Sequence, residues 1–123
     1  MSQNDIIAQK AMDFVIDYET KQGRDTDPVH NKRVGYDIKS GDRKIEVKGS
    51  IVTWNKLSYQ YVTENERKKA THIYLVCNIN ENPDLHIIDI KHARKALVPE
   101  VRYRLNISRC RENESEESKA TRI

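Results

Sequence analysis

The sequence lacks the features that mark several large classes of protein. It has no apolar run of the roughly 18 residues that a membrane-spanning helix needs, and no apolar segment near its N-terminus typical of a signal peptide. Only two cysteines are present, Cys77 and Cys110, which excludes a disulfide framework or a cysteine-based zinc site. They favour a reducing, cytoplasmic location. The four glycines form no phosphate-binding loop, and no Ser/His/Asp arrangement is found.

What remains is a polar composition that still supports a folded core. Hydrophobic residues make up 37% and charged residues 33% of the 123 residues, which suits one small globular domain without disulfides. The net charge of +3 permits a nucleic-acid partner but does not require one. From Arg109 onward the chain is rich in Arg, Glu and Ser with almost no hydrophobic residues. We therefore expect a domain over 1–108 and a disordered polar tail over 109–123.

The predicted elements follow the order α-β-β-β-α-β-β-α-β. Helical spacing of apolar residues predicts a helix over 5–20 that ends before Gly23, and a polar loop over 24–33 follows. Thr63 and Glu66 form a capping-box pattern that opens a second helix. Strands are predicted over 34–40, 43–49, 57–63, 72–79, 85–90 and 101–107, and a short helix over 91–97. This order predicts an α/β fold with a mixed sheet flanked by helices.

The turn between the first two predicted strands fixes their register. Gly41 and Asp42 suit a two-residue type II′ hairpin turn. The apolar partners then share one face of the hairpin, which supports this register. These partners are Ile38 with Ile45 and Tyr36 with Val47.

The same register places two acids opposite each other. Asp37 faces Glu46 with Cβ atoms about 4.5–5.5 Å apart, and Lys48 points to the same side of the strand. Two such carboxylates repel each other unless a cation lies between them. Mg²⁺ suits the site because it is often held by one or two carboxylates with waters and phosphate, and the main-chain carbonyl near Val47 would add a ligand. The alternative is a surface lattice of ion pairs in which Lys39 and Lys44 offset the acids without any catalytic role.

Local sequence then favours the metal site. The strands GYDI (35–38) and IEVKG (45–49) resemble the signature of the PD-(D/E)xK nucleases, which share an αβββαβ core. Within that superfamily the chain is similar to the domain at the C-terminus of the plant protein NO VEIN. Tyr18-Glu19 at the end of the first helix and the segment TENE (63–66) with Ala70 match that domain. The likeness covers roughly residues 8–90.

The resemblance implies a restriction-endonuclease-like fold with extra C-terminal strands and a short helix. It implies that Asp37 and Glu46 bind Mg²⁺, or Mn²⁺ as a substitute, and that Lys48 is the catalytic lysine. Glu19 matches an acid that assists the site in many relatives; the alternative is a solvated helix end. Gln60 matches a supporting polar residue on the third strand; the alternative is an ordinary exposed glutamine. Tyr36 stands where relatives commonly have proline.

The resulting hypothesis is a Mg²⁺-dependent endonuclease acting on DNA rather than RNA. A cut through both strands needs two active centres, which a homodimer would supply. The alternative is a catalytically inactive module that binds nucleic acid or a partner protein. Three aromatic residues, Trp54, Tyr59 and Tyr61, either stack on unpaired bases or belong to the core or a dimer contact. Basic residues expected to contact phosphates are Arg24, Lys32, Arg33, Lys39, Lys44 and Lys56.

Overall fold

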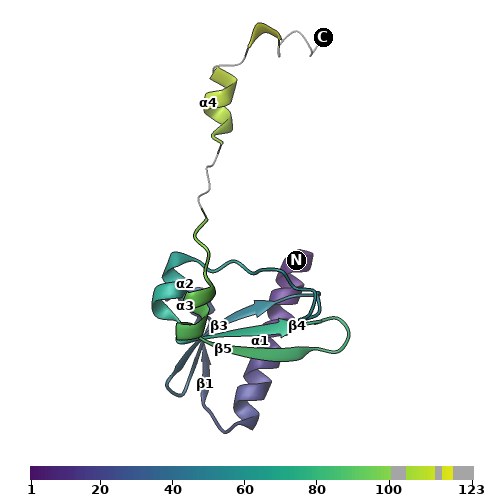
Figure 1. Cartoon of the computed structure of the whole chain (residues 1–123), viewed down its shortest axis with the longest axis vertical. Helices are drawn as coiled ribbons and strands as arrows, with labels where there is room; N and C mark the ends of the chain where they lie inside the picture. The colour runs from purple at the N-terminus through teal and green to yellow at the C-terminus, as the bar shows by residue number, and fades with distance from the viewer. Residues whose placement is uncertain (101–104, 113–114, 118–123) are drawn as a thin grey trace.

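The computed structural model describes residues 1–100, 105–112 and 115–117. Five strands form one sheet in the order β1-β2-β3-β4-β5. The long helix α1 lies against one face, and α2 and α3 lie together at one end of the sheet (Figure 1). The elements are α1 (Gln3–Lys21), β1 (Thr26–Pro28), the 3-10 helix η1 (His30–Lys32), β2 (Ile38–Ser40), β3 (Arg43–Gly49), α2 (Glu64–Lys69), β4 (His72–Cys77), β5 (Asp84–Asp89), α3 (Ile90–Ala96) and α4 (Ile107–Glu112).

Helix α1 covers one face of the sheet. Its N-terminus is closed by a capping box between Ser2 and Asp5, which satisfies main-chain N–H groups that have no partner within the helix. Ala11 and Val15 are fully buried against the strands. Gly23, at φ +80°, follows the helix as expected. Among the described residues, no helix is both long and apolar enough to cross a membrane.

The sheet is mixed, which confirms the predicted fold class. β3 and β4 run parallel, while β1–β2, β2–β3 and β4–β5 are antiparallel. Strand β4 is buried on both faces: Tyr74 and Val76 pack toward α1, whereas Ile73 and Leu75 join a second core with Ala93 of α3. Helix α2 carries the chain between the parallel strands β3 and β4.

One predicted strand is wrong, and one strand was not predicted. Residues 57–63, all of which the structure describes, contain no strand. Both edges of β3 are already occupied by β2 and β4, and Tyr59 and Tyr61 in that segment are 68% and 50% exposed.

The missed strand is β1, within the segment predicted as loop. It is a three-residue edge strand ending at Pro28, which gives almost no periodic signal. The order α1-β1-β2-β3-α2-β4 is therefore αβββαβ.

The C-terminal prediction also changes. Of the strand predicted over 101–107, residues 101–104 lie outside the described residues, Leu105 and Asn106 are not in a strand, and Ile107 begins α4. The Asn106 side chain accepts a hydrogen bond from the Arg109 N–H at 3.2 Å, as a residue that caps a helix does. Residues 109–112, predicted as disordered tail, are helical here. Helix α4 stands apart from the sheet (Figure 1).

Candidate active site

The hairpin of β2 and β3 has the predicted register. Ile38 pairs with Ile45, Lys39 with Lys44 and Ser40 with Arg43. The ladder ends at Ile38, so the predicted pairings of Asp37 with Glu46 and of Tyr36 with Val47 are not part of it. Instead, the Lys44 Nζ lies over the Tyr36 ring, 5.9 Å from the centroid of that ring.

Asp37 takes over the hydrogen bonding where the ladder ends. Its N–H donates to the Ile45 carbonyl at 2.8 Å, and its carboxylate Oδ2 accepts from the Val47 N–H, also at 2.8 Å. The side chain of Asp37 therefore substitutes for a main-chain acceptor along β3. These two bonds fix the carboxylate beside the middle of β3.

Glu46 is a buried acid that meets Asp37. Ile45 and Val47 pack on α1. Because side chains alternate along a strand, Glu46 points to the opposite face of the sheet. Glu46 is only 5% exposed. Burial, then the hydrogen bond and negative charge of Asp37, raise the pKa of Glu46 to about 9. A carboxyl group with such a pKa carries its proton at neutral pH unless a cation replaces it.

Lys48 completes the group on the same face. Its Nζ lies 3.6 Å from Glu46 Oε1 and 3.1 Å from Glu66 Oε1, and its side chain is 18% exposed. The structure thus brings together the three residues that the sequence singled out. It holds the Lys48 amine between two carboxyl groups from different elements.

Glu66 was predicted only as a helix cap, and its proximity to the site was missed. It closes the capping box of α2 by accepting from the Thr63 N–H at 2.9 Å. Burial opposes the charge of Glu66, but the Thr63 N–H and the Lys48 ammonium lower its pKa overall. The capping box could have indicated this proximity. It turns the Glu66 side chain back toward the N-terminus of α2, and α2 follows the strand that carries Lys48.

The acids suit an open metal site rather than a closed cage. Among the described residues, no three His, Cys, Asp or Glu side chains form a metal-binding group. Mg²⁺ needs only one or two carboxylates when waters and substrate phosphate fill its other positions. The Val47 N–H donates to Asp37. Because the N–H and the carbonyl of one strand residue point to the same edge, the Val47 carbonyl also lies on the edge of β3 that faces Asp37. Asp37, Glu46 and the Val47 carbonyl therefore fit an open Mg²⁺ site, in which the cation would replace the proton that Glu46 carries.

Glu19 lies on the other face of the sheet. It is fully buried, and Arg24 donates to both of its carboxylate oxygens at 2.8 Å. Burial alone would raise the pKa of Glu19, but Arg24 lowers it overall. The structure does not bring Glu19 to Asp37 and Glu46, and the alternative of a solvated helix end is wrong. Arg24, predicted to contact phosphate, has Glu19 as its partner within the protein.

Gln60 reaches the neighbourhood of Lys48 without a strand. It lies in the irregular segment before α2, and together with Lys48 it lines two cavities of about 290 Å³ and 470 Å³. The strand predicted for Gln60 is absent in this described segment.

The predicted phosphate-contacting residues are distributed unevenly. Lys39 and Lys44 pair across the hairpin on the face that carries Glu46, because Lys44 alternates with Ile45. Lys32, at the end of η1, and Arg33 and Lys56, in connecting segments, are exposed. Only Lys39 and Lys44 share the hairpin face with the acids.

Comparison with known proteins gives one match. The family model described as Protein NO VEIN, C-terminal, matches residues 7–88. No curated protein and no solved structure matches the chain.

Proposed function

Because the chain belongs to the family of the NO VEIN C-terminal domain, we propose that it is a Mg²⁺-dependent nuclease that hydrolyses phosphodiester bonds of DNA. One observation carries the proposal: Glu46 and Asp37 meet across the hairpin, and the Lys48 amine lies 3.6 Å from Glu46. The αβββαβ order, with Asp37 beside the second strand and Glu46 on the third, supports a place among the PD-(D/E)xK nucleases.

Asp37, Glu46 and the Val47 carbonyl would hold Mg²⁺. Bound there, the ion would lower the pKa of a water molecule and neutralise charge on the phosphoryl group. Glu46 must first release its proton, because only a carboxylate is a metal ligand. Asp37 is already anchored by the Val47 N–H, so one ligand is held in place before binding.

Lys48 would act on the phosphate and the attacking water. Its ammonium is held by Glu66 at 3.1 Å, which restricts where this long side chain points. From that position the ammonium stabilises the negative charge that develops on the phosphoryl oxygens and orients the water. Glu66 is thus a positioning residue, because it acts through Lys48. Lys39 and Lys44 would contact neighbouring phosphates of the same strand.

A duplex cut requires a second active centre. The described residues of one chain offer one such group, so we propose that a homodimer forms on duplex DNA. Sedimentation of the protein with and without a DNA duplex measures this association, and a strictly monomeric complex that still cuts both strands would contradict it.

A non-catalytic binding module on the same fold is the second candidate. The Lys48–Glu66 ion pair and the lack of a three-residue metal-binding group within the described residues favour it. Such a module would bind nucleic acid or a partner protein and leave phosphodiester bonds intact.

A cleavage assay tests the proposed function. Plasmid DNA, single-stranded DNA and RNA are incubated with the full chain in Mg²⁺, in Mn²⁺ or in EDTA. We expect cleavage of DNA with either metal and none in EDTA. Lys48→Ala should lower the rate by about 10²–10³-fold, while Lys21→Ala, at the far end of α1, should leave it unchanged. Absence of cutting, or cutting that survives Lys48→Ala, would overturn the proposal.

A further inference from the structure

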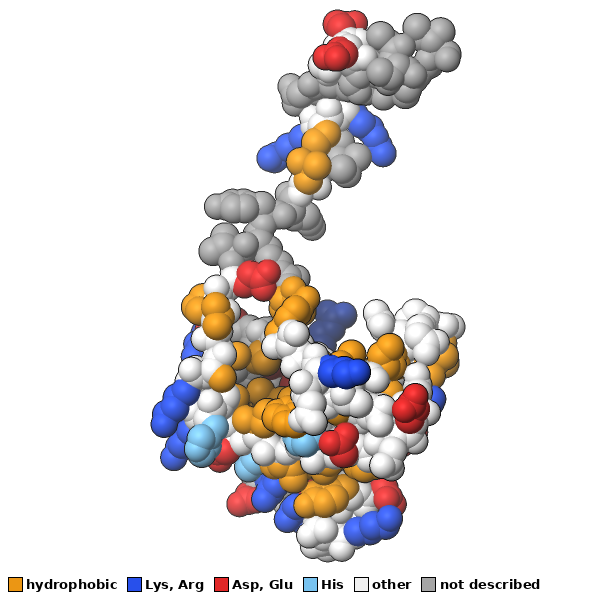
Figure 2. All heavy atoms as spheres, turned by 45° about the vertical axis from the view of Figure 1, so that its right-hand side comes forward, with side chains coloured by type: hydrophobic (Ala, Val, Ile, Leu, Met, Phe, Trp, Pro, Cys, Tyr) orange, Lys and Arg blue, Asp and Glu red, His pale blue; other side chains and the backbone are white. Residues whose placement is uncertain are grey.

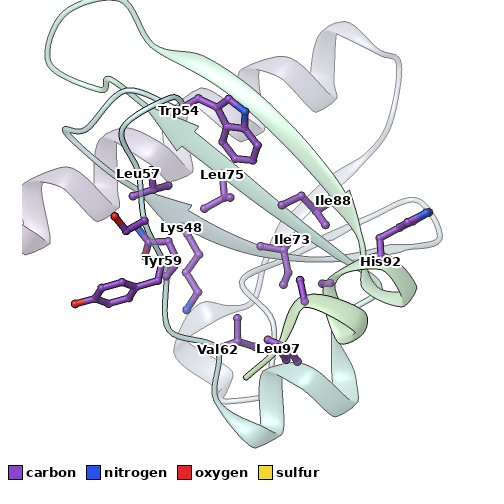
Figure 3. A pocket seen from close by; sticks show the side chains of 14 residues that line it. Lys48, Trp54, Leu57, Tyr59, Val62, Ile73, Leu75, Ile88, His92 and Leu97 are labelled. Carbon is purple, nitrogen blue, oxygen red and sulfur yellow. The ribbon is translucent and has the colours of Figure 1, made fainter. Parts of the chain in front are cut away.

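An apolar cavity lies directly beside Lys48 on the sheet face that carries α3. Its volume is about 290 Å³. Ile73, Leu75 and Ile88 line it from the sheet, and Lys48 enters it from β3 (Figure 3). The segment before α2 and helix α3 supply the remaining walls. The proposed nuclease site and this cavity therefore share one residue, Lys48.

The rim of the cavity carries exposed aromatic rings. Trp54 is 43% and Tyr59 68% exposed. His86 stacks on one face of the Trp54 indole, with ring centroids 4.0 Å apart and planes 13° from parallel. In the space-filling view, hydrophobic side chains gather on the body of the molecule, with histidine, basic and acidic side chains around them (Figure 2).

The polar side chains of the lining are one cation, Lys48, and three groups that both donate and accept hydrogen bonds. These three groups belong to Ser58, Gln60 and His92. An apolar floor with hydrogen-bonding groups and an ammonium fits a flat ring that carries donors and acceptors along its edge and is joined to an anion. The volume lies just below the range of about 300–1,000 Å³ typical of small-molecule sites, so the cavity suits one ring system rather than a large cofactor. A nucleotide has this combination of features.

We infer that the cavity receives the base of an unpaired nucleotide next to the phosphate at Lys48. This inference rests on the proposed function and narrows its substrate to single-stranded or locally unpaired DNA. A base inside a duplex has its faces covered by its neighbours and cannot enter such a cavity. Stacking on aromatic side chains accepts any base, because every base has a flat face. The phosphate attached to the bound base would lie outside the cavity, next to the Lys48 ammonium.

Tryptophan fluorescence tests the inference without any cleavage. Trp54 is the only tryptophan in the chain, so its emission reports directly on the cavity. A single-stranded oligothymidylate is titrated into the full chain in EDTA. We expect quenching of Trp54, and weaker quenching by a blunt duplex of equal length. Tyr59→Ala should weaken oligothymidylate binding about 5–100-fold, whereas Tyr59→Phe should retain it.

Ile87→Ala is the matched control. Ile87 is 40% exposed and pairs with Tyr74, so it lies on the α1 face, away from the cavity, and its removal should not change binding. Unchanged Trp54 emission, or equal binding by Tyr59→Ala and the wild type, would overturn the inference. An emission change with protein concentration alone would also overturn it, because a second copy would then fill the cavity. Cleavage of DNA without a Trp54 response refutes only this inference; a Trp54 response without cleavage refutes only the proposed nuclease activity.

Discussion

Replacing Glu46 by glutamine should remove a pH dependence from the stability of the metal-free protein. The side chain of Glu46 is 6% exposed, and burial and Asp37 raise its pKa from 4.5 to about 9. Between those two values the folded chain holds a proton that the unfolded chain has released. The wild-type protein should therefore lose stability as the pH rises through this window.

The size of the effect follows from linkage. One proton held only by the folded state changes the free energy of unfolding by about 1.4 kcal/mol per pH unit. From pH 6 to pH 8 the wild type should lose as much as about 3 kcal/mol from this group. Glu46→Gln carries no titrating group at this position, so it should approach the wild type only below about pH 4.5, exceed it by about 2 kcal/mol at pH 6 and exceed it by about 5 kcal/mol at pH 8.

Urea unfolding in EDTA at several pH values measures this difference. The comparison of wild type with Glu46→Gln cancels the groups that both proteins share. Asp37→Asn serves as a second variant, because it removes the charge that helps to raise the pKa of Glu46 and should flatten the slope in part. Parallel stability curves for wild type and Glu46→Gln between pH 6 and pH 8 would refute the reasoning, since Glu46 would then be ionised in the folded apo protein.

Three further predictions concern residues around the hairpin. Glu19→Ala should lower the free energy of unfolding by about 3 kcal/mol, because Arg24 loses its buried partner; urea unfolding checks this, and a loss below about 1 kcal/mol would contradict the pairing. Lys39→Ala and Lys44→Ala should each reduce the slope of log K against log salt for DNA binding by about 1, and unchanged slopes would exclude phosphate contact. Gly49→Ala places a Cβ 2.9 Å from that of Ala11 and should lower the free energy of unfolding by about 1–3 kcal/mol, measured by thermal unfolding. An unshifted melting temperature would contradict tight packing of α1 against Gly49.

The hairpin was predictable because two local constraints agree. A two-residue turn and the apolar pair Ile38–Ile45 permit one register, and that register puts Asp37, Glu46 and Lys48 on one face. The single difference, the early end of the ladder at Ile38, depends on the Asp37 side chain competing for the Val47 N–H. Such a side-chain bond is not visible in a pattern of hydrophobic residues.

The rest of the site depends on tertiary packing. Whether residues 57–63 form a strand depends on a free sheet edge, and β3 has none. The face on which Glu19 lies depends on how α1 docks, and the sequence places it only near a helix end. Glu66 was recognisable as a cap, but its contact with Lys48 depends on where α2 crosses between two parallel strands.

Manganese binding tests the central claim most directly. Electron paramagnetic resonance of free Mn²⁺ during titration of the full chain gives the number of sites and their affinity. One site per chain is expected, lost in Asp37→Asn and in Glu46→Gln. It should be retained in Asp42→Asn, which changes the exposed acid at the hairpin turn. Failure of the wild type to bind Mn²⁺, or equal binding by Asp37→Asn, would contradict a metal site on this hairpin.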